Sequence, residues 1–370
     1  MDSSDFDLVV IGAGVIGLSV AFRVKQLKPK IKVAVVGDSV NSLMASRAAA
    51  GMLAPYGESE SNDCFFRFCR ESLDKYPKFV EELVSVSGVP VYLSMSGSIM
   101  PKLLVGDRWE SRLKFLEAVG APFEVWPVDR VREKIPYLSD ECGEVIWVGQ
   151  GQINNRQLHD ALMKGVEKLG VQLIDQRVTG FIKSSESIDY AVTDSGKIKS
   201  HEYVLASGSW SGPLANILGV ELPIKPIKGQ MCRVQVDDDR LDYTVGGYLT
   251  YIAPWREGNG FVLGSTMEDR GYDPAVEKEA IQGLIEQAAR VLPCLRNAPL
   301  IESWTGMRPA AEDGMPVMGK SAQFDNLYYS TGHFRNGILQ TPNQSDYMAG
   351  QILNDTADEI REFSPSRYNL

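Results

Sequence analysis

The stretch DLVVIGAGVIG, residues Asp7 to Gly17, decides the fold that this sequence predicts. Its apolar half is typical of a buried β-strand, and its second half matches the spacing G-x-G-x-x-G at Gly12, Gly14 and Gly17. The next ten residues have helical spacing, and KVAVV (Lys32–Val36) predicts a second parallel strand. This order of strand, glycine turn, helix and strand is typical of a dinucleotide-binding unit.

Two features of this unit concern the dinucleotide directly. Glycines let the backbone approach a pyrophosphate, and the helix N-terminus offers unpaired N–H groups and a positive dipole end. An acidic residue usually follows the second strand and bonds the ribose hydroxyls. Here Gly37 stands first and Asp38 second. Asp38 is therefore either a ribose ligand or a solvated turn residue, and the sequence leaves both open.

A run of small residues, MASRAAAGMLAP (Met44–Pro55), follows this unit. Small side chains let a bulky flat ring lie against the backbone, whereas the alternative is the start of an alanine-rich helix. The loop after it, PYGESESNDCFF (Pro55–Phe66), is interpreted either as a mobile lid or as a plain surface loop.

Composition excludes several classes of function. The chain of 370 residues is long enough for two cores, and its formal charge of −10 argues against nucleic acid as a partner. Apolar runs stop short of the roughly 20 residues of a membrane span, and no basic signal region precedes them. Five cysteines form no metal-ligand cluster with the histidines, which indicates reduced thiols and no metal. A cytoplasmic location is expected.

The remaining patterns predict a discontinuous α/β organisation. Helices are expected over Cys64–Ser87 and Asn155–Leu169, and a β-hairpin over Val89–Leu104. Alternating segments after residue 221 are typical of an antiparallel sheet. We expect a nucleotide-binding unit over 1–85, 150–220 and 305–370, and a second unit over 86–149 and 221–304.

Five motifs carry a resemblance to a known family: GAGVIG, SRAAAGMLAP, LASGSWSG, WTGMRPAAEDGMPVMG and GHFRNGI. With them the chain resembles the FAD-dependent D-amino acid oxidase superfamily, and within it the glycine oxidases of thiamine biosynthesis. The resemblance implies a Rossmann-like FAD-binding domain of the glutathione-reductase type and an α+β substrate domain with a large mixed, mostly antiparallel sheet. It also implies noncovalent FAD, since no cysteine or histidine stands where covalent attachment is usual, and a homo-oligomer.

The resemblance also implies site residues. Arg308 in TGMRP corresponds to the arginine that holds the substrate carboxylate, Tyr251 to a pocket tyrosine, and Arg335 to a second arginine. Predicted pocket-lining residues are Met52, Leu249 and Met267. Predicted FAD contacts are Gly12, Gly14, Val15, Ile16, Gly17, Asp38, Ala45, Ser46, Ala50, Gly51, Met52, Val178, His333, Phe334, Arg335, Asn336, Gly337, Ile338 and Leu339.

Two positions depart from the glycine oxidases. Gly37 stands where they usually have glutamate, which leaves ribose recognition open. Leu249 stands where they have histidine, which leaves glycine itself open as the substrate.

The expected chemistry is oxidation of a small amine, such as glycine, sarcosine or a small D-amino acid, to the imine by hydride transfer to flavin N5. A guanidinium matches a carboxylate with two parallel hydrogen bonds and stays charged, so Arg308 with Tyr251 fixes the substrate. The alternative for Arg308 is an ion pair with Glu312 or Asp313. A helix beginning near Gly337 is expected to face the flavin, with polar and cationic support from His333 and Arg335.

Oxygen is the expected electron acceptor, giving H2O2, and the imine is hydrolysed to the 2-oxo acid. One alternative is a dehydrogenase for a D-amino acid or secondary amine that uses a quinone or protein acceptor. Another is a flavoprotein subunit without catalytic activity.

Overall fold

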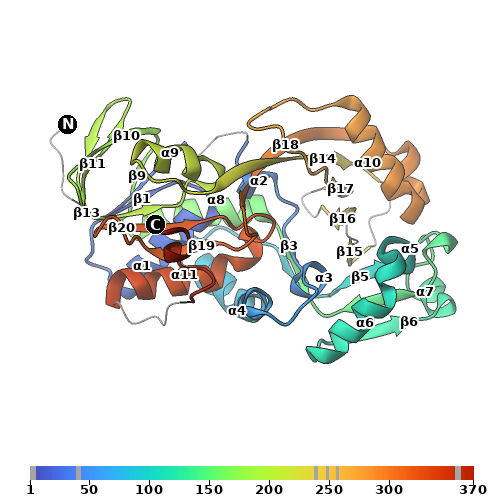
Figure 1. The fold of residues 1–370 in the computed structure, drawn as a ribbon. Helices are drawn as coiled ribbons and strands as arrows, with labels where there is room; N and C mark the ends of the chain where they lie inside the picture. The colour runs from blue at the N-terminus through green and yellow to red at the C-terminus, as the bar shows by residue number, and fades with distance from the viewer. Residues whose placement is uncertain (1–5, 39–42, 237–240, 247–249, 256–257, 355–359) are drawn as a thin grey trace.

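The computed structural model of the protein describes residues 6–38, 43–236, 241–246, 250–255, 258–354 and 360–370, and it contains two large sheets lying side by side (Figure 1). The first has the order β19-β20-β13-β1-β2-β9, and all its pairs are parallel except β19 with β20. Its strands are β1 (Phe6–Ile11), β2 (Val33–Val36), β9 (Gln172–Ile174), β13 (Ser200–Leu205), β19 (Val317–Lys320) and β20 (Leu327–Thr331). The parallel pairing predicted for the first two strands is confirmed.

Strand β1 is continuously apolar from Leu8 to Ile11 because both of its faces are buried there. Leu8 and Val10 pack into the core under helices α1, α4, α8 and α11, while Val9 and Ile11 pack into a second cluster on the opposite face. A strand covered on both sides needs no polar alternation, which explains the continuous run in the sequence.

The second sheet has the order β18-β14-β17-β16-β15-β5-β7-β6 and is antiparallel except where β15 pairs with β5. Its strands are β5 (Ser98–Pro101), β6 (Phe123–Trp126), β7 (Val145–Val148), β14 (Ile224–Val234), β15 (Thr244–Gly246), β16 (Tyr251–Pro254), β17 (Phe261–Gly264) and β18 (Leu300–Ala311). The predicted fold class is confirmed by the two sheets and by the structural comparison reported below.

Two small sheets complete the strands. One contains β10 (Val178–Lys183), β11 (Ile188–Thr193) and β12 (Gly196–Ile198), and the other β3 (Met52–Leu53), β8 (Gly151–Ile153) and β4 (Leu93–Ser94). The α-helices are α1 (Val15–Leu27), α2 (Ala45–Ala48), α3 (Pro55–Glu58), α4 (Cys64–Ser87), α5 (Lys102–Val105), α6 (Trp109–Ala118), α7 (Val128–Lys134), α8 (Asn155–Lys168), α9 (Ser211–Ile217), α10 (Lys278–Val291) and α11 (Gly337–Asn354). Within the described part of the chain, none of them combines the length and the apolar character needed to cross a bilayer.

The predicted hairpin over Val89–Leu104 is wrong. Strand β4 pairs with β8, whereas β5 pairs with β7 and β15. Strands β4 and β5 both form, but each pairs with strands that are distant in the sequence.

Strands β14 and β18 connect the two large sheets. They pair from Ile224 with Ala311 to Val234 with Leu300, and Figure 1 shows them running from one half of the molecule into the other. Ile224 and Ala311 pack in a core cluster of the first sheet, whereas Val234 packs in the core of the second. The unit boundary predicted at residue 305 therefore falls inside a continuous strand.

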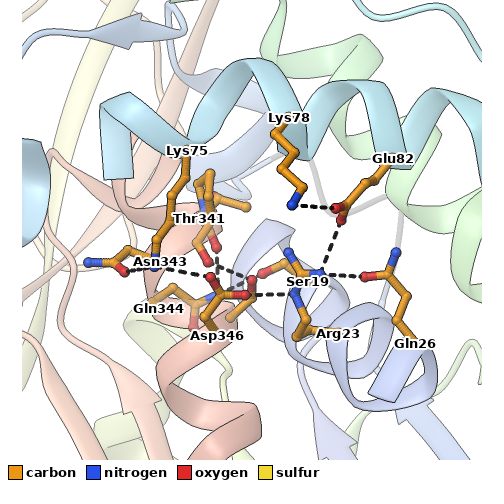
Figure 2. Close-up of polar contacts among 12 residues, drawn as sticks. Ser19, Arg23, Gln26, Lys75, Lys78, Glu82, Thr341, Asn343, Gln344 and Asp346 are labelled. Carbon is orange, nitrogen blue, oxygen red and sulfur yellow. Dashed lines mark hydrogen bonds and ion pairs between the residues drawn. The ribbon is translucent and has the colours of Figure 1, made fainter. Parts of the chain in front are cut away.

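A polar network joins α1, α4 and α11 on the side of the first sheet (Figure 2). Arg23 of α1 lies between Glu82 of α4, at 3.1 Å, and Asp346 of α11, at 2.7 Å. Lys75 of α4 also pairs with Asp346 at 3.1 Å. These contacts join three helices of the layer that packs on one face of the first sheet.

Candidate functional site

A cavity of about 670 Å³ begins at the carboxyl ends of β1, β2 and β13 and continues to the second sheet. That position, outside the carboxyl ends of parallel strands, is where dinucleotides bind in such sheets. The predicted residues that line the cavity are Gly12, Gly14, Val15, Ile16, Asp38, Ala45, Ser46, Ala50, Gly51, Met52, Val178, Tyr251, Arg308, His333, Phe334, Arg335, Asn336, Gly337 and Ile338. Residues from the start, the middle and the last part of the sequence thus meet at one cavity.

Three predicted residues do not line the cavity, and a fourth lies outside the described residues. Gly17 packs inside the turn, where a Cβ would overlap the carbonyl oxygen of Gly12. Leu339 is buried in the core of the helix layer. Met267 is 53% exposed and does not line the cavity, and Leu249 lies outside the described residues.

The glycine turn fits the dinucleotide that the resemblance implies. A Cβ on Gly12 would overlap the carbonyl oxygen of Ala206, and Gly12 has φ of 128°. Helix α1 begins after Gly14 with no side-chain cap and no acidic residue in its first turn. The Val15 N–H at this positive end donates to Ser46 Oγ at 3.1 Å, and Gly14, Val15 and Ile16 line the cavity, where a pyrophosphate is expected to bind.

Asp38 follows β2 and lines the cavity, where Arg177 donates to its carboxylate at 3.3 Å. Gly37 is required before it, since a Cβ there would lie 2.7 Å from the backbone nitrogen of Ala13. The departure at Gly37 thus has a steric reason, and Asp38 remains our predicted ribose ligand.

The small residues after β2 lie between the cavity and β18. Helix α2 is a single turn, and Trp304 of β18 donates to the carbonyl oxygen of Ala48 at 2.9 Å. A Cβ on Gly306 would overlap the Ala48 side chain. Small residues are needed here both for the cavity and for this close approach to the strand that carries Arg308.

Arg308 and Tyr251 meet where the cavity reaches the second sheet. The Arg308 guanidinium donates to Ser265 Oγ at 2.6 Å and to the carbonyl oxygens of Thr266 and Lys228 at 3.2 and 3.4 Å. All these acceptors are neutral, and no carboxylate among the described residues pairs with Arg308. Burial lowers the pKa of Arg308 and raises the pKa of Tyr251, because the interior disfavours the charged form of each group. A buried guanidinium with only neutral partners favours an anion as its ligand.

The alternative partners suggested by the sequence are excluded for Arg308. Asp313 pairs instead with Arg367 at 2.7 Å, and neither Asp313 nor Glu312 lines the cavity. Arg308, which lies in β18 and lines the cavity, therefore makes no ion pair with Glu312 or Asp313.

Two glycines make room for this pair. A Cβ on Gly229 of β14 would overlap the Arg308 guanidinium, and a Cβ on Gly264 of β17 would overlap the Tyr251 phenol. Sequence reasoning missed both glycines and Ser265. Only knowledge of which strands pair could have found them, because each acts across the sheet.

Arg335 lines the cavity but is already paired. It donates to Glu58, the last residue of α3, at 2.7 Å. Sequence reasoning missed Glu58 as a site residue, although it lies in the segment interpreted as a lid or surface loop.

His333 lies buried in the turn before α11. Its Nδ1 is 2.6 Å from Gln340 Oε1, and its Nε2 has no hydrogen-bond partner among the described residues while the residue lines the cavity. Burial lowers the pKa of His333 to about 4, so the ring is neutral at physiological pH. His333 can therefore offer the cofactor a polar contact but no charge.

Comparisons with known proteins agree with this geometry. Residues 7–350 match a family described as FAD dependent oxidoreductase. A bifunctional protein ThiO/ThiG from Trichormus variabilis is 33% identical over 98% of this chain, which spans 55% of that relative's length. The chain thus covers about half of the bifunctional relative.

A glycine oxidase from Geobacillus kaustophilus is 29% identical over 98% of this chain and 97% of its own length. A crystal structure of glycine oxidase from Geobacillus kaustophilus superposes with a TM-score of 0.90 at 27% identity, covering 97% of this chain and 98% of that one. The likeness in fold therefore extends over both large sheets.

Proposed function

The chain belongs to the family of FAD-dependent oxidoreductases, and from this membership we propose that it oxidises a small amino acid or amine to the imine. The proposed substrates are glycine, sarcosine or a small D-amino acid, with O2 as acceptor. The observation that carries the proposal is the Arg308 guanidinium, which lines the cavity beside Tyr251 with only neutral hydrogen-bond partners. The name of the relative from Geobacillus kaustophilus, a glycine oxidase, supports the substrate class.

Bound FAD supplies a two-electron acceptor at its N5. Gly12, Gly14 and the start of α1 are proposed to hold the pyrophosphate, Asp38 the ribose, and the turn from His333 to Ile338 the flavin ring. Arg308 and the Tyr251 hydroxyl bind the substrate carboxylate and orient the Cα–H bond, which is the main task that this reaction gives the protein.

The proposed reaction requires no acid or base from the protein. The Cα–H bond breaks with its electron pair, the nitrogen lone pair forms the C=N bond, and the nitrogen then loses a proton. Water adds to the imine and the nitrogen leaves as ammonia, or as methylamine when the substrate is sarcosine, giving the 2-oxo acid, while O2 takes up two electrons and two protons to give H2O2.

The proposal is tested by mixing the purified yellow protein anaerobically with glycine, sarcosine, D-alanine, D-proline and larger D-amino acids. We expect one of the small amines to bleach the visible flavin absorbance. Rapid recovery in air indicates an oxidase, and slow recovery with fast turnover on a quinone indicates a dehydrogenase. Tight FAD binding with no bleaching by any amine would contradict the proposal and favour a subunit without catalytic activity.

The matched variant is Arg308→Gln, because glutamine keeps hydrogen-bonding capacity and loses the charge. We expect the KM to rise about a hundredfold or more while FAD stays bound. Arg367→Gln is the control, since Arg367 pairs with Asp313 away from the cavity. An unchanged KM in Arg308→Gln would exclude Arg308 as the carboxylate ligand.

A homo-oligomeric state and a cytoplasmic location stay predictions. Light scattering of the purified protein measures the first directly, and fractionation of cells that express the chain measures the second.

A further inference from the structure

The ion pair between Glu58 and Arg335 has no assigned role in the proposed reaction. We propose that Glu58 makes the pocket selective for amines with one carboxylate, because it occupies the arginine that a second carboxylate would bind. This inference rests on the proposed function and names which amines that site accepts.

The pair lies in the cavity, next to the residues that bind the substrate. Arg335 donates to Glu58 Oε1 at 2.7 Å, and the two side chains are 27% and 21% exposed. Both line the same cavity as Arg308 and Tyr251. Both charges also act on Arg308, since Arg335 lowers and Glu58 raises the pKa of that guanidinium. The three charged groups therefore form one electrostatic unit.

The charges of this unit indicate what it binds. The Arg308 guanidinium has only neutral partners, whereas the Arg335 guanidinium is balanced by Glu58. Asp38 and Arg177, which also line the cavity, bond to each other. Of the charged residues that line the cavity, Arg308 is the one that has no partner of opposite charge among the described residues. A single carboxylate satisfies it, and a second carboxylate would meet the negative charge of Glu58.

The backbone around Glu58 is held in place, so its carboxylate can discriminate between amines with one and two carboxylates. The buried guanidinium of Arg112 donates to the carbonyl oxygen of Tyr56 at 2.8 Å and to that of Ser59. These two contacts fix the backbone on both sides of Glu58. The interpretation of this segment as a mobile lid is therefore not favoured, and Arg112 acts as a positioning residue for Glu58.

The same segment offers a matched control. Glu60 pairs with Arg108 at 2.9 Å, but these side chains are 64% and 44% exposed and neither lines the cavity. Replacing Glu60 removes the same kind of carboxylate from the same loop without changing the cavity.

The substrates are also matched. Iminodiacetate is sarcosine with one added carboxylate on the methyl group, so the ratio of the two isolates the effect of that carboxylate. Effects common to both amines cancel in the ratio, whereas any effect on the added carboxylate remains.

The experiment measures kcat/KM for iminodiacetate and sarcosine with the FAD-loaded protein, and the dissociation constants of both by anaerobic calorimetry. In Glu58→Ala we expect the iminodiacetate-to-sarcosine ratio to rise about tenfold or more. Glu58→Gln is expected to raise it less, since the amide oxygen still bonds Arg335. Glu60→Ala is expected to leave it within about twofold. In the double variant Glu58→Ala with Arg335→Ala, we expect the iminodiacetate-to-sarcosine ratio to return to about the wild-type value.

An unchanged ratio in Glu58→Ala, or an equal rise in Glu60→Ala, would overturn the inference. If Glu58→Ala does not fold, the ratio in Glu58→Gln decides, and no rise there would overturn it. If the wild-type protein oxidises no amine, the proposed function fails, and the ratio of dissociation constants still decides whether Glu58 discriminates.

Discussion

His333 shows how one residue couples the cavity to stability. Gln340 donates to the Cys69 sulfur at 3.3 Å, which places its amide oxygen toward His333 Nδ1. An amide oxygen only accepts, so the proton of the neutral ring lies on Nδ1 and the lone pair on Nε2. Cys69 is itself buried, and burial raises its pKa to about 12, so the thiol stays protonated. Burial keeps the His333 ring neutral by lowering its pKa, whereas the hydrogen bond with Gln340 acts in the opposite direction.

The neutral state of buried His333 makes the free energy of unfolding depend on pH. The pKa of His333 is about 4 in the folded protein and 6.5 in its ordinary range, so the unfolded chain binds a proton that the folded protein rejects. Stability is therefore complete above about pH 6.5 and is lost as the pH falls toward 4. The loss from this residue is on the order of 3 kcal/mol.

We expect His333→Asn to remove this part of the pH dependence. Urea unfolding at saturating FAD between pH 6.5 and 4 measures it. His201→Asn is the control, because the His201 side chain is 72% exposed. A pH profile of His333→Asn identical to that of the wild type would refute the assignment.

At the scale of elements, the helix layer depends on Arg23, which joins three helices (Figure 2). The Arg23 side chain is 17% exposed, and its removal leaves Asp346 paired only with Lys75 at 3.1 Å and Glu82 only with Lys78 at 4.0 Å. We expect Arg23→Ala to lower the free energy of unfolding by about 1–2 kcal/mol, measured by urea denaturation.

Arg70→Ala is the control for this prediction. Arg70 faces Asp74 one turn along α4 at 4.0 Å, with side chains 50% and 67% exposed. Its loss is expected to cost under about 0.5 kcal/mol. Equal losses in the two variants would show that Arg23 acts only as a surface charge.

Elements with local signals were predicted well, because their determinants lie within them. Helix α4 has the bounds Cys64–Ser87 expected from the sequence, since Asp63 caps its start and Gly88, with φ of 71°, ends it. The hairpin over Val89–Leu104 was predicted wrongly because strand partners are set by tertiary structure. Nothing near β4 indicates that it pairs with β8, about sixty residues further on.

At the scale of the molecule, β14 and β18 make the two sheets one cooperative unit. Each strand packs in the core of the first sheet at one end, through Ile224 and Ala311, and in or beside the core of the second sheet at the other. We expect a single urea transition, with the same midpoint for flavin fluorescence, tryptophan emission and circular dichroism. Trp126, buried in the second core, reports on the sheet farther from the glycine turn. Two separated midpoints would contradict the prediction.

The same scale limits what the sequence can predict about the site. The sequence predicted Arg308, Tyr251 and the turn at His333, because each lies within a short contiguous motif that resembles a motif of the family. Glu58 and Gly229 were missed, since the first matters only through Arg335 and the second only through the Arg308 guanidinium above it. Their roles arise where distant strands and loops meet.

The cavity also has a consequence for synthesis of the protein on the ribosome. Its walls include the glycine turn near the start of the chain and residues up to Ile338, so it cannot form until translation has passed that residue. At about 5–20 residues per second this takes roughly 20 to 70 s. During that interval β1 lacks its neighbour β13 until residue 205 has emerged. Cofactor capture is thus a late event, and the nascent apolar strands need protection from aggregation until then.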